Sequence, residues 1–431
     1  MQSRAAVILS KNKVEVRVLD LPDLGPDEIL MRVVSSSMCL STYKAMSLGS
    51  EHKRVPDDLE DVPVMTGHEF AGVIEQVGPD LAGQYTAGQS IAIQPAMGLP
   101  TGYSPGYSYP FYGGDATYCI IPKFAIDKGC VLPYVGSYYA NGSLAEPMSC
   151  IIGAFNASYH TEQFIYTHQM GIRKNGTLAL LGCGGAMGAG ALDYALNGPY
   201  HPRVVVAMDT DSERLQRLQK LFPPEAAAAR GISLTFINSL NINPRKLLMD
   251  AVDDRGFDDV MVFAASQELV EIADAVLGND GCLNFFAGPT DKKFSAHLNF
   301  YNVHYETTHI VGTSGGSRGD MEESLELTAK GLLNPSFMVT HIGGLNAVPH
   351  ALAGLPTFRG GKILAYPHVE MDLTAIEDFD RKADADPRFK QLARICSQHE
   401  NIWNEEAERY LLDAFAQNRV DHPSLSSENS R

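Results

Sequence analysis

Basic residues are scarce in this chain. Its 431 residues include 34 lysines and arginines against 51 aspartates and glutamates, which gives a formal net charge of −17 at pH 7. Proteins that bind nucleic acids set lysine and arginine against phosphates and usually carry a basic domain or stripe. We therefore expect neither DNA nor RNA as a partner.

Cysteine, export signals and long apolar runs are also sparse. The 7 cysteines are scattered and never form Cys-x-x-Cys, which does not match a disulfide framework. The first apolar run, 5–9, is short and soon meets Lys11, which is too little for an export signal. The apolar stretch 177–196 is interrupted by Asp193 and glycines. We expect a cytoplasmic protein without a membrane segment.

Two architectures follow one another along the sequence. Short β runs broken by Gly and Pro predict an all-β first region with strands near 5–9, 14–19, 29–35, 70–77, 90–94 and 117–121. Apolar residues at helical spacing then predict a helix within 143–159. Six further strands alternate with helices and predict a doubly wound parallel sheet; they are 177–181, 203–208, 233–237, 258–263, 281–286 and 309–312.

These patterns predict an α/β fold with three parts. The catalytic β domain would cover 1–158 and be completed by about 332–368, where a mixed pattern returns. The dinucleotide-binding domain would cover 159–331. An acidic, helix-prone C-terminal extension would cover 369–431, and it holds the chain's only tryptophan, Trp403.

A glycine-rich turn follows the first strand of the predicted parallel sheet. Glycines let the backbone approach a pyrophosphate, whose charge suits the N-terminus of the next helix. Plain turns contain glycine too, but this one joins a predicted strand to a predicted helix, the context of a dinucleotide fingerprint. Cys183 stands where the first fingerprint glycine belongs, which leaves a shift of the turn by one residue open. The predicted binding residues are Gly182, Gly184, Gly185, Met187 and Gly188.

Asp209 ends the second predicted strand of this sheet. A carboxylate there accepts hydrogen bonds from ribose hydroxyls and repels a 2′-phosphate, which favours NAD over NADP. A solvated aspartate at a strand end is the alternative interpretation. Arg203 or Arg214 could still serve an NADP phosphate, so we predict NAD and keep NADP open.

Four side chains in the first region and the following helix suit a metal ion. Cys39, His68, Glu69 and Glu146 offer sulfur, nitrogen and oxygen ligands, a mixture that zinc accepts tetrahedrally, with one position open in catalytic sites. Each residue alone fits a structural role in a core. The sequence leaves open which glutamate binds directly and which acts through water.

The sequence resembles the zinc-dependent alcohol dehydrogenases of the medium-chain dehydrogenase/reductase superfamily over roughly 4–368. The features that carry the resemblance are Cys39, Gly67-His68-Glu69 with spaced glycines, Glu146-Pro147, and the glycine-rich turn before Asp209. The resemblance implies a GroES-like catalytic domain, a Rossmann domain, one catalytic zinc and a homo-oligomer, either a dimer or a tetramer. Relatives often bind a structural zinc through four cysteines, but 95–118 contains none, so we expect no structural zinc.

The reaction implied by the resemblance is zinc-assisted hydride transfer between NAD(H) and an alcohol or carbonyl carbon. The resemblance also implies that Glu69 acts in catalysis at the metal site. Ser41, two places after Cys39, would begin the proton relay, with a turn-capping hydroxyl as its alternative role. Lys44 stands where relatives often have histidine, and it would pass the proton on or contact an anionic substrate.

Within the superfamily, the chain resembles the polyol and sugar-phosphate dehydrogenases in particular, above all the L-sorbose-1-phosphate reductase group. The segments that carry this resemblance are 51–58, 106–110, 146–157 and 311–316. The resemblance implies a polyol or ketose as substrate, phosphorylated as in the name of the group. An unphosphorylated polyol or secondary alcohol, or a catalytically silent NAD-binding protein, are the alternatives.

A short basic run could bind the substrate phosphate. His52, Lys53 and Arg54 follow soon after the predicted ligand Cys39 in a strongly acidic protein. Acidic residues come directly afterwards and could neutralise the run; they are Asp57, Asp58, Glu60 and Asp61. Basic loops are usually solvated, so both interpretations stand at this point.

Overall fold

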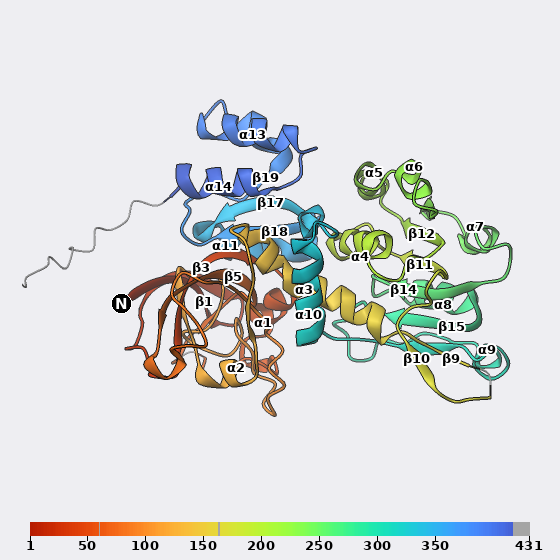
Figure 1. Cartoon of the computed structure of the whole chain (residues 1–431), viewed down its shortest axis with the longest axis horizontal. Coiled ribbons are helices and arrows are strands. Elements are labelled where there is room, and N and C mark those ends of the chain that lie inside the picture. Colours follow the sequence, from red (N-terminus) through yellow and green to blue (C-terminus); the bar gives the residue numbers. More distant parts are fainter. Residues whose placement is uncertain (60, 163, 417–431) are drawn as a thin grey trace, which may run out of the picture.

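The structure is a computed structural model that describes residues 1–59, 61–162 and 164–416. Two regions, each built around a sheet, lie side by side, and helix α3 (Tyr139–Ala157) runs between them (Figure 1). The C-terminal helices pack at one end of the first region. Glu60 of the acidic run and residues 417–431 of the predicted extension lie outside the described residues.

The first region is built on a mixed sheet of eight strands in the order β19-β17-β18-β3-β5-β6-β8, with β7 paired to β3. A three-stranded sheet, β2-β1-β4, completes it. Strands β17 and β18 come from the far end of the chain. The bounds are β1 Gln2–Ser10, β2 Lys13–Asp20, β3 Ile29–Ser37, β4 Val64–Met65, β5 Glu69–Val77, β6 Ser90–Ile93, β7 Tyr118–Ile121, β8 Val131–Pro133, β17 Val339–Gly344, β18 Lys362–Tyr366 and β19 Thr374–Ala375.

Three α-helices interrupt this region; the sequence pattern predicted only strands before about residue 135 and a mixed pattern in 332–368. They are α1 (Leu40–Leu48), α2 (Lys123–Asp127) and α11 (Val348–Gly354). The first turns of α1 contain serine, threonine and tyrosine, which have modest helix propensity. Burial of Thr42, Ala45 and Met46 holds α1 in place, so tertiary packing rather than local preference forms this helix.

The second region is a six-stranded sheet in which every pair is parallel. Its order, β13-β12-β11-β14-β15-β16, is the doubly wound order of dinucleotide-binding folds. This sheet confirms the predicted α/β fold class. The strands are β11 Thr177–Leu181, β12 Val204–Asp209, β13 Ser233–Asn238, β14 Phe257–Val262, β15 Leu277–Phe285 and β16 His309–Val311, and a separate hairpin pairs β9 Tyr159–Thr161 with β10 His168–Met170.

Helices flank the parallel sheet. Its strands are buried on both faces, as the near-continuous apolar runs of β11 and β12 show. The helices are α4 Ala186–Asn197, α5 Ser212–Leu221, α6 Pro224–Ala228, α7 Arg245–Asp250, α8 Gln267–Ala275 and α9 Phe300–Tyr305. Helix α10 (Arg318–Ala329) follows β16 and packs against α3.

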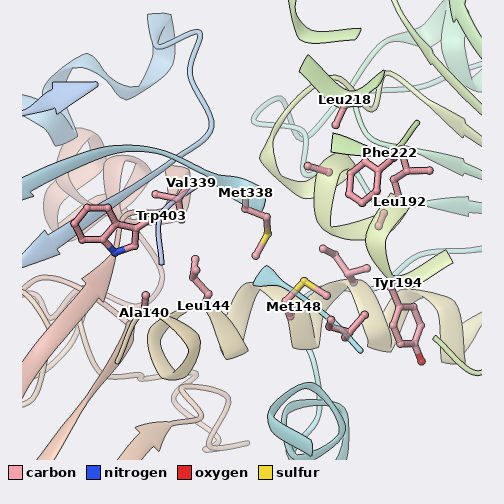
Figure 2. Close-up of a cluster of buried hydrophobic side chains, with 14 of the residues drawn as sticks. Ala140, Leu144, Met148, Leu192, Tyr194, Leu218, Phe222, Met338, Val339 and Trp403 are labelled. Atoms are coloured by element: carbon pink, nitrogen blue, oxygen red, sulfur yellow. The ribbon is translucent and has the colours of Figure 1, made fainter. Parts of the chain in front are cut away.

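One continuous apolar cluster ties the parts together along α3. Figure 2 shows Ala140, Leu144 and Met148 on α3, with Trp403 at one end and Phe222 at the other. The cluster therefore reaches from the C-terminal helices to the helices of the parallel sheet. Burying such side chains stabilises the fold by about 1.5–3 kcal/mol each.

The C-terminal extension is helical, as its composition predicted. It contains α12 (Phe379–Lys382), α13 (Arg388–Gln398) and α14 (Glu405–Ala414). Trp403 is 1% exposed, so the described part of the extension packs on the molecule. Among the described residues, no helix is both long enough and apolar enough to cross a membrane.

Candidate functional site

Three potential metal ligands meet where β3 and β5 pair. Cys39 Sγ, a ring nitrogen of His68 and a carboxylate oxygen of Glu69 all lie within 4.8 Å of one another. Cys39 follows β3, Glu69 opens β5, and Ser37 of β3 is the register partner of Glu69. Strand pairing thus joins the two sequence motifs, and the S, N and O atoms form a donor set that suits zinc.

Glu69 is held by a buried lysine. Both of its carboxylate oxygens accept hydrogen bonds from Lys362 Nζ, at 2.6 and 2.5 Å, and Lys362 opens β18 on the other side of β3. Burial raises the pKa of Glu69, but the charges of Lys362 and His68 and the hydrogen bonds from Lys362 together hold this pKa below its ordinary value. Burial likewise opposes the charge of Lys362, yet Glu69 raises the pKa of the ammonium. The two form a buried ion pair.

The His68 ring is fixed by two hydroxyl groups. Tyr107 Oη lies 2.8 Å from Nδ1 and 3.1 Å from Nε2, and Thr42 Oγ1 lies 3.2 Å from Nδ1. The Tyr107 and His68 rings are tilted, with centroids 4.8 Å apart. Burial lowers the pKa of His68, which favours the neutral imidazole that metals bind.

The glycine before His68 is required by close packing. Gly67 has φ +85°, and a Cβ added there would lie 2.5 Å from the backbone nitrogen of Asp115. The Asp115 carboxylate in turn accepts hydrogen bonds from Ser36 Oγ and Thr66 Oγ1, both at 2.7 Å. A larger residue at position 67 would displace the loop that presents His68.

Glu146 faces the group from α3 but is not part of the 4.8 Å cluster. It is 7% exposed, and the weak Cys150 thiol donates to Oε1 at 3.6 Å. Burial, followed by the negative charge of Glu69, raises the pKa of Glu146 to about 7. Its carboxylate therefore has no cation to hold it as Lys362 holds Glu69.

The two predicted relay residues lie three positions apart on α1. Ser41 Oγ is 2.9 Å from Cys39 Sγ, and it also hydrogen-bonds the Tyr107 hydroxyl. Lys44 Nζ donates to the carbonyl of Gly288 at 3.1 Å, in the segment after β15 of the parallel sheet. Ser41 thus joins the metal-ligand cluster, whereas Lys44 reaches across to the second region.

The three residues predicted to bind a phosphate, His52, Lys53 and Arg54, have different surroundings in the structure. The Arg54 guanidinium carbon lies 5.3 Å from the centroid of the Tyr107 ring, and His52 stacks on the same ring at 6.1 Å between centroids. Lys53 is exposed. Asp57, Asp58 and Asp61 are exposed as well, so Arg54 and His52, but not Lys53, flank the tyrosine that contacts His68.

The glycine-rich turn adopts the shape a dinucleotide site requires. Gly182 has φ +71°, and a Cβ added to Gly188 would lie 1.8 Å from the Cys183 carbonyl oxygen. No other atom lies within 4 Å of a Cβ built at Gly185. The left-handed residue is Gly182, directly before the cysteine in the first fingerprint position, and Gly188 allows close packing of α4 on β11.

Asp209 lies against this turn. Its Oδ2 accepts the Gly184 N–H at 2.7 Å, and its Oδ1 accepts the Asp211 N–H at 2.9 Å. A Cβ at Gly184 would be 2.9 Å from both the Asp209 carboxylate and Arg214 Cβ. The Arg214 guanidinium donates to the Arg359 carbonyl at 3.1–3.2 Å. Met187 lies half-buried in the first turn of α4.

Sequence reasoning missed Lys362 and Tyr107 as site residues. Lys362 starts a strand whose residues are all buried, and a lysine leading an apolar run was the available signal. Tyr107 lies in the Gly-, Pro- and Tyr-rich loop 95–118, in the segment 106–110 that carried part of the family resemblance but was given no role at the site. No local pattern distinguishes Tyr107 from the other tyrosines there.

Comparison with known proteins agrees with this geometry. Residues 25–150 match the alcohol dehydrogenase GroES-like domain. A mannitol-1-phosphate 5-dehydrogenase of Aliivibrio fischeri is 58% identical over 96% of this chain and 98% of its own length. An L-sorbose 1-phosphate reductase of Klebsiella pneumoniae is 42% identical over the same shares.

Solved structures show the same fold at low identity. The 2R,3R-butanediol dehydrogenase of Bacillus subtilis aligns with TM-score 0.69 and 17% identity, covering 85% of this chain and 99% of that one. The fold, the donor cluster and the near full-length relatives define the class of protein. The chain belongs to the zinc-dependent alcohol and polyol dehydrogenases of the medium-chain dehydrogenase/reductase superfamily. Sugar-phosphate enzymes are among its relatives in that superfamily.

Proposed function

We propose that this protein transfers hydride between NAD(H) and a phosphorylated polyol or ketose, with one zinc ion per chain. The observation that carries the proposal is the Cys39, His68 and Glu69 cluster, with Arg54 beside it across the Tyr107 ring. The names of the two near full-length relatives, which act on mannitol 1-phosphate and L-sorbose 1-phosphate, support the substrate class. Zinc would supply a Lewis acid at the substrate oxygen, and NAD(H) the hydride acceptor or donor.

We infer that Cys39, His68 and Glu146 bind the zinc directly. Glu69 would remain paired with Lys362 and would not be a direct ligand. Lys362 contacts both oxygens of Glu69, so a direct bond to zinc would compete with a buried ion pair. Glu146 has only the weak Cys150 thiol as a donor. Its carboxylate would complete the site by turning toward a metal ion held by Cys39 and His68.

Ser41 would move the proton between the substrate oxygen and the rest of the chain. Its hydroxyl contacts Cys39 Sγ and the Tyr107 hydroxyl, so it can accept a proton on one side and donate on the other. Lys44, held on the Gly288 carbonyl, is placed to orient a ligand lying between the two sheet regions.

Metal analysis and a substrate panel test the proposal. We expect one zinc per purified chain, NADH oxidation with L-sorbose 1-phosphate or NAD⁺ reduction with mannitol 1-phosphate, and slower turnover of free L-sorbose and mannitol. Cys39→Ala should lose zinc, whereas Cys396→Ala, which removes a buried thiol of α13, should retain it. Faster turnover of the free sugars would favour an unphosphorylated polyol. Neither zinc nor turnover would favour a silent NAD-binding protein.

Arg54 and His52 are proposed to bind the substrate phosphate. Arg54→Ala should lower kcat/KM for the phosphorylated sugar by about tenfold to a hundredfold, since charge-assisted hydrogen bonds contribute about 1.5–3 kcal/mol. The free sugar should be much less affected. The exposed Lys53→Ala is the matched control. An equal loss for phosphorylated and free sugar would remove the phosphate role.

We propose NAD rather than NADP as the cofactor. Asp209 supports this, because its buried carboxylate lies against Gly184 of the turn, where it would repel a 2′-phosphate. Wild-type kcat/KM should be higher with NADH than with NADPH. Asp209→Ser should bring the kcat/KM values for the two cofactors closer together. A wild-type preference for NADPH would contradict the assignment.

We also propose a homo-oligomer, a dimer or tetramer. Large apolar side chains are exposed on α9, which precedes the edge strand β16; they are Phe300, Tyr301 and Tyr305. Such patches mark protein contacts more often than free surface. Light scattering behind size exclusion should give a mass of two or four chains, and a monomeric mass would contradict the proposal.

A further inference from the structure

Helix α3 carries Glu146 and depends on contacts from outside for its first turns. It has 19 residues, its N-cap Tyr138 makes no side-chain cap, and no acidic residue stands in its first turn. Pro147 lies inside the helix, so the backbone bond that would end at the Ser143 carbonyl is missing. Pro147 thus removes one backbone hydrogen bond of α3, and the N–H groups of its first turn need acceptors from outside the helix.

Glu408 of the C-terminal extension supplies the missing cap. Its Oε2 accepts the Tyr139 N–H at 2.6 Å, and its Oε1 accepts the Ala140 N–H at 2.8 Å. The side-chain oxygens of an acidic residue at a helix N-terminus satisfy N–H groups that have no partner within the helix. A residue far along the chain thus performs the role that an N-cap side chain ordinarily has.

A buried hydrogen-bonded chain holds Glu408 in this place. Tyr366 Oη donates to Glu408 Oε1 at 2.8 Å, and Trp403 Nε1 donates to Tyr366 Oη at 2.7 Å. Glu408 and Trp403 are each 1% exposed, and Tyr366 is fully buried. Figure 2 places Trp403 close to Ala140 and Leu144 of α3. The extension therefore contacts the N-terminal turns of α3 through both hydrogen bonds and apolar packing.

Glu146 stands seven positions after Tyr139, close to two full helical turns, and directly before Pro147. A shift of the capped end would therefore move Glu146, because both lie in the helical segment before Pro147. We propose that Glu408 is a positioning residue for Glu146: the C-terminal extension fixes the first turns of α3 and thereby fixes the carboxylate that completes the metal site. This role rests on the proposed function of Glu146 as a zinc ligand.

Two matched substitutions on α14 test the role. Glu408→Gln replaces one acceptor oxygen by an NH₂ group that faces a backbone N–H. Glu405→Gln makes the same change on the same helix, where Glu405 accepts only an exposed bond from Ser137 Oγ. The readouts are zinc retention against a chelator, kcat and KM, and amide hydrogen exchange over 139–146. Fluorescence of Trp403, the single tryptophan, shows whether the extension remains docked.

Loss of a residue that orients a metal ligand typically costs about tenfold to a hundredfold in metal affinity or activity. We expect Glu408→Gln to retain zinc about tenfold less well, to lower kcat by a similar factor with little change in KM, and to speed exchange over 139–146. Glu405→Gln should match the wild type. Tyr366→Phe, which removes one support of Glu408, provides a milder second variant if Glu408→Gln does not fold.

The double variant Glu408→Gln with Glu146→Gln identifies the route. If Glu408 acts through Glu146, its effect on zinc retention should vanish once Glu146 is neutral. An undiminished effect would overturn the role. So would a Glu408→Gln protein that melts at a lower temperature but binds zinc and turns over like Glu405→Gln. Wild-type protein without zinc or turnover would instead overturn the proposed function, and the positioning role with it.

Discussion

Glu69 and Glu408 are equally buried, each 1% exposed, yet their surroundings favour opposite charge states. Glu69 pairs with the Lys362 ammonium, and its pKa lies below the ordinary value. Glu408 receives only neutral donors, namely two backbone N–H groups and the Tyr366 hydroxyl. Burial outweighs those donors and raises the pKa of Glu408 to about 8.

The difference shows that a full positive charge, rather than the number of hydrogen bonds, decides the charge of a buried carboxylate in this molecule. Glu146 resembles Glu408 in this respect. Within the described part of the chain it forms no ion pair, and burial raises its pKa to about 7. Glu69 is thus fixed by its ion pair with Lys362, while the Glu146 carboxylate remains available to bind a metal ion.

Breaking the Glu69–Lys362 pair should have the largest effect on stability. Lys362→Met leaves a buried carboxylate without its cation, which typically costs about 3–5 kcal/mol. The free energy of unfolding from denaturant titration measures this loss. The double variant Glu69→Gln with Lys362→Met removes both charges and should recover much of it. A loss below about 1 kcal/mol in the single variant would show that the pair does not hold Glu69 charged.

A change at Trp403, the end of the C-terminal hydrogen-bonded chain farthest from α3, should cost less stability than loss of the ion pair. Trp403→Phe removes the indole N–H that supports Tyr366 and leaves a small gap, and we expect a loss of about 1–3 kcal/mol. Zinc content should stay at the wild-type level because the Glu408 cap on α3 remains. Tyr305→Phe, at a site that is 63% exposed, is the control and should change stability by less than about 0.5 kcal/mol. Loss of zinc in Trp403→Phe would show that the indole N–H is also needed to hold Glu408 on α3.

The last effect concerns pH and develops gradually. Because the folded pKa of Glu408, about 8, lies above its unfolded value, the folded state binds this proton more tightly. Its contribution to stability is complete below the unfolded pKa and is lost as pH rises through about 8, by at most about 1.4 kcal/mol per pH unit. The groups around this carboxyl are Tyr134, Tyr138, Tyr366 and Glu405.

Thermal unfolding from pH 5 to pH 9 measures this contribution. As pH rises, the Tm of the wild type should fall relative to the Tm of Glu408→Gln. Parallel curves for the two proteins would mean that Glu408 keeps one charge state throughout that range.

Much of the fold was predictable because its signals are local. The six strands of the parallel sheet show apolar runs and turn residues, and the observed strands differ from the predicted ones by only a few residues at their ends. Helix α1 was missed because its propensity is modest and its stability comes from burial. The helical character of the extension followed from its composition, but its docking did not.

Prediction of the site was partial for the same reason. Cys39, His68 and Glu69 were identifiable from residue type and spacing, and strand pairing brings them together. Lys362 is distant in sequence and has no motif around it, so its contact with Glu69 could not be read from the chain. The contrast between Arg54 against the Tyr107 ring and the exposed Lys53 was equally hidden.

The sequence by itself determined the alternation of strands and helices, the glycine turn before Asp209 and the set of possible metal ligands, because these depend on side-chain type and short spacing. The tertiary structure decided which glutamate meets a lysine, which one stays available, and that Glu408 caps α3. Charge state and capping depend on distances between atoms far apart in the chain, and those distances exist only once the sheet has closed and the C-terminal helices have docked.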